Sequence, residues 1–363
     1  MGKSMLKFIE SSNKSIWEGK NYKKLAKKGL YEVYFIIFHN AKRHESYWIR
    51  YTLVCNKQKK NRNDKVGQGL LWFGYFNSQE PNKNFMVKKH FPLEKVKGTF
   101  IENGVIKFIT IDNAFLSLLK ATGKFMTKSG KEFLWELSFS KFQKPYYAVP
   151  KLARTLKITN TINNATHPHF EVSGKVVMNG IEIQIEKADG IQYHTYADSY
   201  KHPWEWFSVY TIKEWPLGFI DFSYKVNKGI LEINNGETSL TSWNKNFLMK
   251  LLKSKKLKRK KTIDSIIFNM VTKQLSIEGI VDVSKNDLIG VEYLGPTGEK
   301  FYCYNSEIAS VKLKIIRQGK KKNENIINEI VVNRSIAFET TDKEPIEGIK
   351  YLNWNDEELF TNY

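Results

Sequence analysis

Cysteine is scarce in this sequence. Cys55 and Cys303 are the two cysteines among 363 residues, and they form no CxxC pair and have no histidine at metal-ligand spacing. This spacing excludes a disulfide-stapled framework and a cysteine zinc site. We therefore expect reducing, cytoplasmic surroundings.

Long apolar runs are also missing. The first residues, MGKSMLKFIESSNKSIW, lack the apolar core of a signal peptide, and no later stretch approaches the roughly 20 apolar residues of a membrane-spanning helix. Leu6 stands where N-myristoylation requires Ser or Thr. Glycine-rich phosphate loops, zinc-ligand spacings and GxSxG elbows are absent, which excludes most nucleotide, metal and serine-hydrolase chemistry. The sequence predicts a soluble protein.

Arginine is rare although the chain is strongly basic, with 58 Lys and Arg against 37 Asp and Glu, a net charge of +21. Nucleic-acid readers favour arginine, whose planar fork grips phosphates and guanine edges, whereas lysine is a point charge that any solvated surface carries. The composition therefore favours a lysine-coated exterior over a nucleic-acid partner. The one dense run, LLKSKKLKRKKT at 251–262, has two interpretations: a solvated loop or helix end, and a site for anionic lipid or RNA.

Period-two alternation of β-branched and aromatic residues dominates the chain and is typical of half-buried strands. Asn-Gly pairs at 103–104, 179–180 and 235–236 separate such runs and suit two-residue hairpin turns. These features predict an all-β protein built from antiparallel hairpins. The clearest strands are expected at 31–39, 47–54, 70–76, 131–140, 170–178 and 181–187.

Helices are predicted at 19–28, 114–123 and 244–256. The length favours two domains of roughly 150 to 200 residues. Alternation is lost between Tyr147 and Pro168, where Pro, Asn and Thr gather, so we place an N-terminal domain at 1–160 and a C-terminal domain at 161–363. The polar tail from Lys343 is expected to be an arm or a late helix.

The stretch GIQYHTYADSYKHPWEWFSVYT, 190–211, concentrates rings and polar side chains. In a strand, Trp204, Trp206, Ser208 and Tyr210 would share one face, and His194 would share a face with Tyr196. A histidine between aromatic strands is either a satisfied structural residue or a catalytic group. Both interpretations stay open on this pattern alone.

From Gly190, the pattern G-x-x-x-H-x-Y-A-D, then Pro and WEWF, resembles the signature of the two-domain lipocalin-like superfamily. That group includes carotenoid hydratases, tocopherol cyclase, Svf1-like stress proteins and lipocalin-like Diels-Alderases. The segments YEVY at 31–34 and YWIRYTL at 47–53 resemble the family's first strands, and 291–309 its closing hairpin. The resemblance implies two consecutive lipocalin-like antiparallel β-barrels around a long apolar cavity. It also implies chemistry on isoprenoid, polyene or polyketide chains without a metal or organic cofactor.

Protonating an alkene requires a carboxylic acid kept neutral by burial, and the resulting cation requires aromatic faces. The rings of Trp204, Trp206, Tyr193 and Tyr196 are candidates for those faces. The hydratases carry a Tyr-x-Asp before the shared histidine, where this chain has Ile191 and Tyr193, so their proton donor is absent. The candidates for a substitute donor are Asp198, Asp189, and an acid–base pair of His194 with Tyr193. A cyclisation guided by shape alone needs only a preorganised cavity.

Further ligand-binding candidates lie in the first half of the chain. Alternation allows an inward pair of Arg50 with Glu136, which is either structural or in contact with substrate. Trp48, Trp72 and Trp135 are core aromatics or cavity lining. The cluster HPH at 167–169 lacks a further ligand type nearby, and we do not expect it to bind a metal.

These features favour a lipocalin-like protein that encloses an apolar isoprenoid or polyene and promotes its cyclisation or isomerisation. We expect His194, Tyr193 and Asp198 to be catalytic, and Trp204, Trp206, Tyr196, Trp48, Arg50, Glu136 and Trp135 to contact the ligand. The alternative is a non-catalytic lipid carrier or stress protein. The lysine run at 251–261 adds a peripheral contact with anionic membrane, and nucleic-acid binding is the weakest hypothesis.

Overall fold

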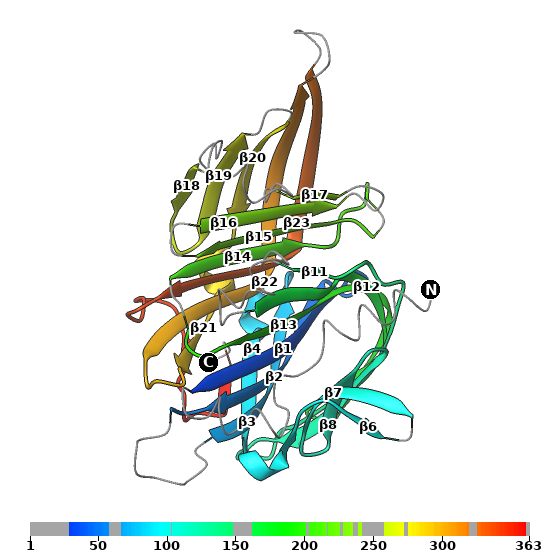
Figure 1. Cartoon of the computed structure of the whole chain (residues 1–363), viewed down its shortest axis with the longest axis vertical. Helices are drawn as coiled ribbons and strands as arrows, with labels where there is room; N and C mark the ends of the chain where they lie inside the picture. Colours follow the sequence, from blue (N-terminus) through cyan, green and yellow to red (C-terminus); the bar gives the residue numbers. More distant parts are fainter. Residues whose placement is uncertain are drawn as a thin grey trace, which may run out of the picture.

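The computed structural model describes residues 29–57, 67–102, 104–147, 162–200, 203–215, 217–225, 228–234, 239–241, 258–271, 275–318 and 325–360. Within these ranges the regular structure consists of β-strands and three short 3-10 turns: η1 (Pro81–Lys83), η2 (Leu93–Lys95) and η3 (Lys285–Asp287). The described ranges contain no helix that is long and apolar enough to cross a membrane. The strands form two curled sheets, one above the other in Figure 1.

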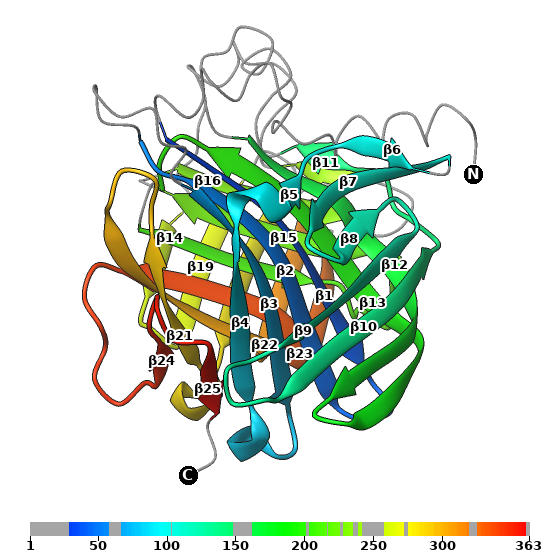
Figure 2. The same cartoon turned by 90° about the horizontal axis from the view of Figure 1, so that it is seen from below.

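The first sheet has 14 strands and curls around its own interior (Figure 2). Along the main path the order is β25 (Glu358–Phe360), β4 (Phe85–Pro92), β3 (Gly67–Asn77), β2 (Glu45–Cys55), β1 (Leu30–Asn40), β13 (Ile181–Ala197), β12 (Ile162–Met178), β10 (Glu132–Ser140), β9 (Lys120–Met126), β8 (Ala114–Ser117), β7 (Val105–Ile111) and β5 (Val96–Lys97). Off this path, β11 (Tyr146–Tyr147) pairs with β12, and β6 (Phe100–Glu102) pairs with β7.

The second sheet has 11 strands. Its order is β17 (Ser239–Thr241), β16 (Lys228–Asn234), β15 (Phe219–Lys225), β14 (Trp204–Val209), β23 (Asn325–Asp342), β22 (Lys300–Gln318), β20 (Leu275–Asp282), β19 (Ser265–Val271) and β18 (Lys258–Lys261). Beside this path, β21 (Ile289–Leu294) pairs with β22 and lies parallel to β24 (Tyr351–Leu352). The predicted all-β class, with two consecutive curled antiparallel sheets and short helical turns, is confirmed.

Hairpin turns occur where the sequence predicted them, at the predicted positions that lie within the described residues. Asn179 and Gly180 both adopt positive φ, 51° and 83°, and join β12 to β13, as an Asn-Gly turn requires. The expected closing hairpin at 291–309 is formed by β21 and β22. Asn103 and the pair at 235–236 lie outside the described residues.

The predicted helix at 114–123 is wrong, because this segment forms β8 and the start of β9, joined by a tight turn. Ser117 stabilises the turn by accepting a hydrogen bond from the Lys120 amide at 3.1 Å. Gly123 lies so close to Trp135 that a Cβ there would come within 2.1 Å of its ring. This packing against β10 outweighs the helical spacing of the leucines. The predicted helices at 19–28 and 244–256 lie outside the described residues.

The chain changes sheets between Ala197 and Trp204. The expected domain break at residue 160 lies outside the described residues, and β12 and β13, on its C-terminal side, belong to the first sheet. The tail after Lys343 contains β24 and β25, and β25 returns to the edge of the first sheet.

Strand alternation produces three apolar clusters, because each strand places alternate side chains on opposite faces. One cluster fills the first half-barrel, the interior of the first sheet, and includes Tyr34, Tyr51 and Trp135. A second fills the interior of the second sheet. The third lies between the sheets, and its members include Tyr193 and Trp206. Each face of the central strands β1, β2 and β13 is therefore buried against a different cluster.

Candidate functional site

Strand β13 divides the predicted site residues between two faces of the first sheet. In the register with β1, Tyr34 lies opposite His194 and Phe35 lies opposite Tyr193. Successive side chains of a strand point to opposite faces, so His194 points into the first half-barrel and Tyr193 points toward the second sheet. The hypothesis that His194 and Tyr193 form one acid–base pair is therefore wrong.

On the interior face, His194 forms a buried pair with Glu32. His194 Nε2 lies 2.8 Å from Glu32 Oε1, and the relative exposures of the two residues are 1% and 0%. The Tyr34 ring stacks on the His194 ring with centroids 4.0 Å apart and an interplanar angle of 7°. The Tyr34 hydroxyl donates to Glu32 Oε1 at 3.4 Å. Pairing with a carboxylate fixes the orientation of the imidazole.

Aromatic rings surround this pair. Tyr196 lies 5.7 Å from the His194 ring, and its partly buried side chain packs against the same apolar cluster. Deeper in the half-barrel, Trp135 Nε1 donates to the Tyr51 hydroxyl at 2.8 Å. Burial, followed by the charge of Glu32, raises the pKa of the Cys55 thiol to about 12, so Cys55 stays protonated there.

The opposite face carries a different network, between the sheets. The Tyr193 hydroxyl and Trp206 Nε1 both donate to Asp221 Oδ1, at 2.5 Å and 2.8 Å. The Phe35 ring stacks on Tyr193 at 5.1 Å, and Trp206 meets Tyr193 edge-on at 5.2 Å. The shared face predicted for Trp204 and Trp206 is confirmed, and it looks toward the first sheet.

Asp221 is a buried acid of the kind that the sequence appeared to lack. Its relative exposure is 3%, and burial, reinforced by the neighbouring Glu232 carboxyl, raises its pKa well above the usual range. In the register of β15 with β16, Asp221 and Glu232 lie directly opposite each other. Sequence reasoning missed Asp221 because its contact with Tyr193 joins residues of two different sheets.

Arg50 lies between the sheets rather than in the first half-barrel. Its guanidinium donates to the Tyr293 hydroxyl and, through Nε, to Thr52 Oγ1 at 2.9 Å. Its Cζ lies 4.6 Å from the centroid of the Tyr293 ring and 5.6 Å from those of both Trp48 and Trp72. Desolvated cation–π contacts of this kind hold the two sheets together.

The expected pair of Arg50 with Glu136 does not form. Glu136 is exposed on the outer surface of β10, where Lys175 Nζ lies 3.8 Å from its Oε2. Alternation along β2 and β10 was predicted correctly. The error arose because the sequence does not say which face of each of these two strands lines the first half-barrel.

The other candidates are dispersed. Asp198 follows β13, is half-buried and accepts a hydrogen bond from the Ser199 hydroxyl at 3.3 Å. Trp204 Nε1 donates to Glu339 Oε1 at 2.6 Å between the sheets. Asp189 Oδ1 lies 2.9 Å from His169 Nε2. Among the described residues, no group of three or more His, Cys, Asp and Glu side chains is arranged to hold a metal ion.

Solved structures that are similar to this chain include two of CghA and one of kievitone hydratase. The complex of CghA with Sch210972 has a TM-score of 0.48 at 6% identity, over 88% of this chain and 90% of that one. CghA alone also has a TM-score of 0.48 at 6% identity, over 86% of this chain and 88% of that one. Kievitone hydratase from Nectria haematococca has a TM-score of 0.44 at 8% identity, over 87% of this chain and 92% of that one. No family model and no curated protein matches the chain. At these identities and TM-scores, function has to be argued from the residues themselves.

Proposed function

We propose that this chain encloses a long apolar molecule, an isoprenoid or polyene, in the first half-barrel and promotes its isomerisation or cyclisation. The observation that carries the proposal is the buried Glu32–His194 pair among the rings of that interior, at 2.8 Å. A paired imidazole in an otherwise apolar interior is suited to proton transfer. The proposal requires no metal or organic cofactor.

The chemistry assigned to the pair conserves atoms and electrons. The imidazole of His194 removes a proton from a carbon acidified by conjugation and returns it to another carbon of the same chain. Glu32 orients the ring and stabilises the imidazolium between the two steps. The surrounding rings exclude water and fold the substrate, which is sufficient to bring the two ends of a chain together for a cyclisation.

Product analysis tests the proposal. Purified protein is incubated with conjugated polyenes and isoprenoids, and the products are separated by chromatography with mass spectrometry. The variant His194→Gln should lose about a hundredfold or more in turnover, a typical share for a proton-transfer group, while it still binds the substrate. The exposed Glu136→Gln serves as the control. Unchanged turnover in His194→Gln would refute the assigned role.

A carrier without catalysis is the second candidate. It is favoured by the near-complete burial of His194 and Glu32, which satisfy each other as a structural pair would. A carrier should bind apolar molecules and release them unchanged. The variant Glu32→Gln should then lower stability without altering any product.

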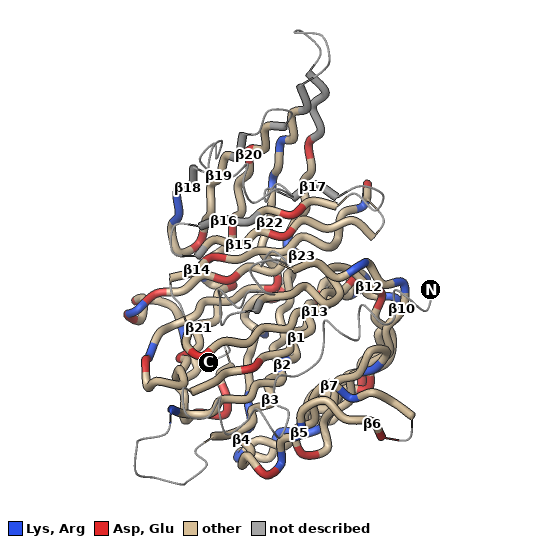
Figure 3. Tube along the Cα trace, viewed as in Figure 1, with Lys and Arg blue, Asp and Glu red and all other residues tan. Residues whose placement is uncertain are grey.

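A peripheral contact with anionic membrane remains a proposal for the basic segment. Within 251–261, the described part is β18 at the edge of the second sheet (Figures 1 and 3), where Lys261 Nζ lies 3.3 Å from the buried Glu205. Flotation with vesicles of phosphatidylserine, compared with neutral vesicles, tests the contact, since lysine attraction requires anionic lipid. A measurement of RNA binding by the purified protein at physiological salt tests the weaker nucleic-acid hypothesis.

A further inference from the structure

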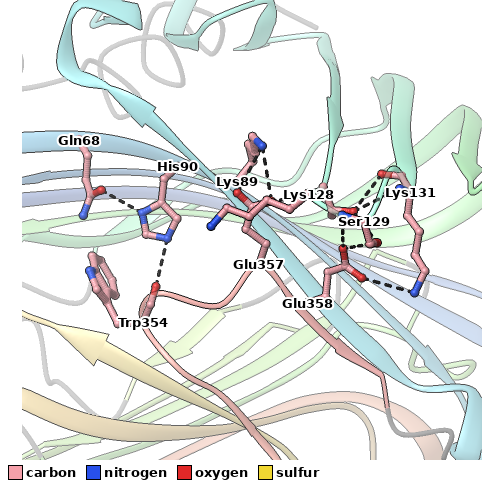
Figure 4. Close-up of polar contacts among 10 residues, drawn as sticks. Gln68, Lys89, His90, Lys128, Ser129, Lys131, Trp354, Glu357 and Glu358 are labelled. Atoms are coloured by element: carbon pink, nitrogen blue, oxygen red, sulfur yellow. Dashed lines mark hydrogen bonds and ion pairs between the residues drawn. The ribbon is translucent and has the colours of Figure 1, made fainter.

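The C-terminal segment returns from the second sheet and lies across the first. After β24 the chain crosses to β4, and β25 then pairs antiparallel with it, Glu358 opposite Val87 and Phe360 opposite Phe85. Figure 4 shows Trp354 of this segment beside His90 of β4, and Glu357 and Glu358 beside the β9–β10 turn at 127–131. We call residues 353–360 the latch.

The latch is bound to β4 mainly through its own backbone carbonyl groups. The Lys88 amide donates to the Glu357 carbonyl at 2.8 Å, and Lys88 Nζ donates to the Asn353 carbonyl at 2.6 Å. His90 Nε2 lies 3.1 Å from the Trp354 carbonyl oxygen (Figure 4). These contacts extend the edge of the sheet by one short strand.

The Glu357 carboxylate lies 3.3 Å from Lys89 Nζ of β4, and both carboxylates of the latch also reach a different part of the sheet. The Lys128 amide donates to Glu357 Oε2 at 2.7 Å, Ser129 donates its hydroxyl to Glu358, and Lys131 Nζ lies 3.4 Å from Glu358 Oε2 (Figure 4). In the sheet order, β9 and β10 are separated from β4 by six and five strands, β3, β2, β1, β13 and β12 lying between β4 and β10. The latch therefore bridges two distant strands that curling brings together.

A ring of the latch also covers the apolar interior. Phe360 packs on Phe85 with centroids 5.1 Å apart, and Phe85 in turn lies 5.6 Å from Phe133 of β10. Lys131 Nζ lies 3.5 Å from the centroid of the Phe360 ring. The junction between β4 and the β9–β10 turn, which we call the seam, is thus covered by the Phe360 ring and by the Glu357 and Glu358 carboxylates.

We propose that the latch gates the first half-barrel: it closes the seam and opens to let an apolar molecule enter and leave. This gating rests on the binding function proposed above. The latch is the part of the wall suited to open, because a three-residue edge strand and partly exposed ion pairs open at lower free energy than the central strands.

The test compares entry rates in matched variants. Glu357→Ala combined with Glu358→Ala removes both bridging carboxylates. The control, Glu344→Ala with Glu347→Ala, removes two exposed carboxylates of the same tail. The probe is cis-parinaric acid, a fluorescent polyene fatty acid, followed by stopped-flow fluorescence. A second variant, Ser129→Ala, removes one latch contact from the opposite side of the seam and perturbs the fold least.

A gate alters rates without altering the equilibrium. Binding and release rates should both rise on the order of tenfold in the double variant, as expected for the loss of a few weak polar contacts, with the dissociation constant nearly unchanged. The Ser129→Ala variant should show a smaller rise, and the control none. Hydrogen exchange at the Lys88 and Lys128 amides should accelerate in parallel.

Two negative results are distinguishable. Saturable uptake with equal rates in all variants would overturn the latch and leave the binding function standing. No saturable uptake by the unaltered chain would overturn the proposed binding function, and the gating that rests on it.

Discussion

His194 and Tyr193 are adjacent in β13 and belong to different networks. His194 lies 2.8 Å from Glu32 inside the first half-barrel, and Tyr193 donates to Asp221 at 2.5 Å between the two sheets. The two side chains lie on opposite faces of the first sheet, so the sheet itself separates them. The adjacent residues Tyr193 and His194 thus belong to two separate hydrogen-bond networks, one between the sheets and one inside the first half-barrel.

Substitutions at the two positions should therefore have separate effects. His194→Gln should lower turnover of a bound polyene by about a hundredfold or more. Tyr193→Phe should keep turnover and lose about 1 kcal/mol of unfolding free energy, the usual worth of one hydrogen bond. Product analysis and urea denaturation of both variants check this. An equal loss of turnover in Tyr193→Phe would place both residues in one site.

Asp221→Asn should stabilise the protein increasingly as the pH rises. The raised pKa means that folded Asp221 keeps a proton that the unfolded chain releases near pH 4, so its contribution is complete below that pH and declines above it. An asparagine side chain does not titrate, so the variant does not lose stability in this way as the pH rises. Urea denaturation between pH 4 and pH 8 should show the variant gaining on the unaltered chain by up to about 1.4 kcal/mol per pH unit. The exposed Asp282→Asn serves as the matched control.

Lys88 should make stability depend on pH in the alkaline range. Burial lowers its pKa to about 7, against about 10.4 in an unfolded chain. Between these values the unfolded chain binds the extra proton, so stability rises with pH. Relative to Lys88→Met, the unaltered protein should gain up to about 4 kcal/mol from pH 7 to pH 10.4. Denaturation of both proteins across this range measures the difference, and a constant difference would contradict a lowered pKa.

His167 should contribute to acid unfolding. Burial lowers its pKa to about 3, against about 6.5 when unfolded. Its stabilising contribution is therefore present above pH 6.5 and is lost as the pH falls toward 3. His167→Gln, which cannot titrate, should be the more acid-resistant protein by about 3 kcal/mol at pH 4. Circular dichroism during acid titration of the two proteins checks the sign.

Much of the fold was readable from local patterns. Alternation at 31–39, 47–54 and 70–76 predicted β1, β2 and β3, and Asn179-Gly180 predicted the turn between β12 and β13. The prediction failed at 114–123, where apolar spacing suited a helix. There the fit of Gly123 against Trp135 fixes a strand instead, and that contact is invisible in the local sequence.

The candidate site was predicted less completely. His194 and its shared face with Tyr196 followed from the motif, but the partner Glu32 lies 162 positions away in the chain. Asp221 lies 28 positions from Tyr193 and in the other sheet. Contacts between residues far apart in sequence depend on sheet order and curl, which no local pattern encodes.

By itself, the sequence determined the strands, their alternating faces and several of their turns, because these depend on period-two patterning and on residues that tolerate positive φ. The tertiary structure decided which face of each strand is interior, which carboxyl meets which ring, and where the tail returns. Strand alternation divides side chains between two faces, but only the packing of two curled sheets gives each face its partner.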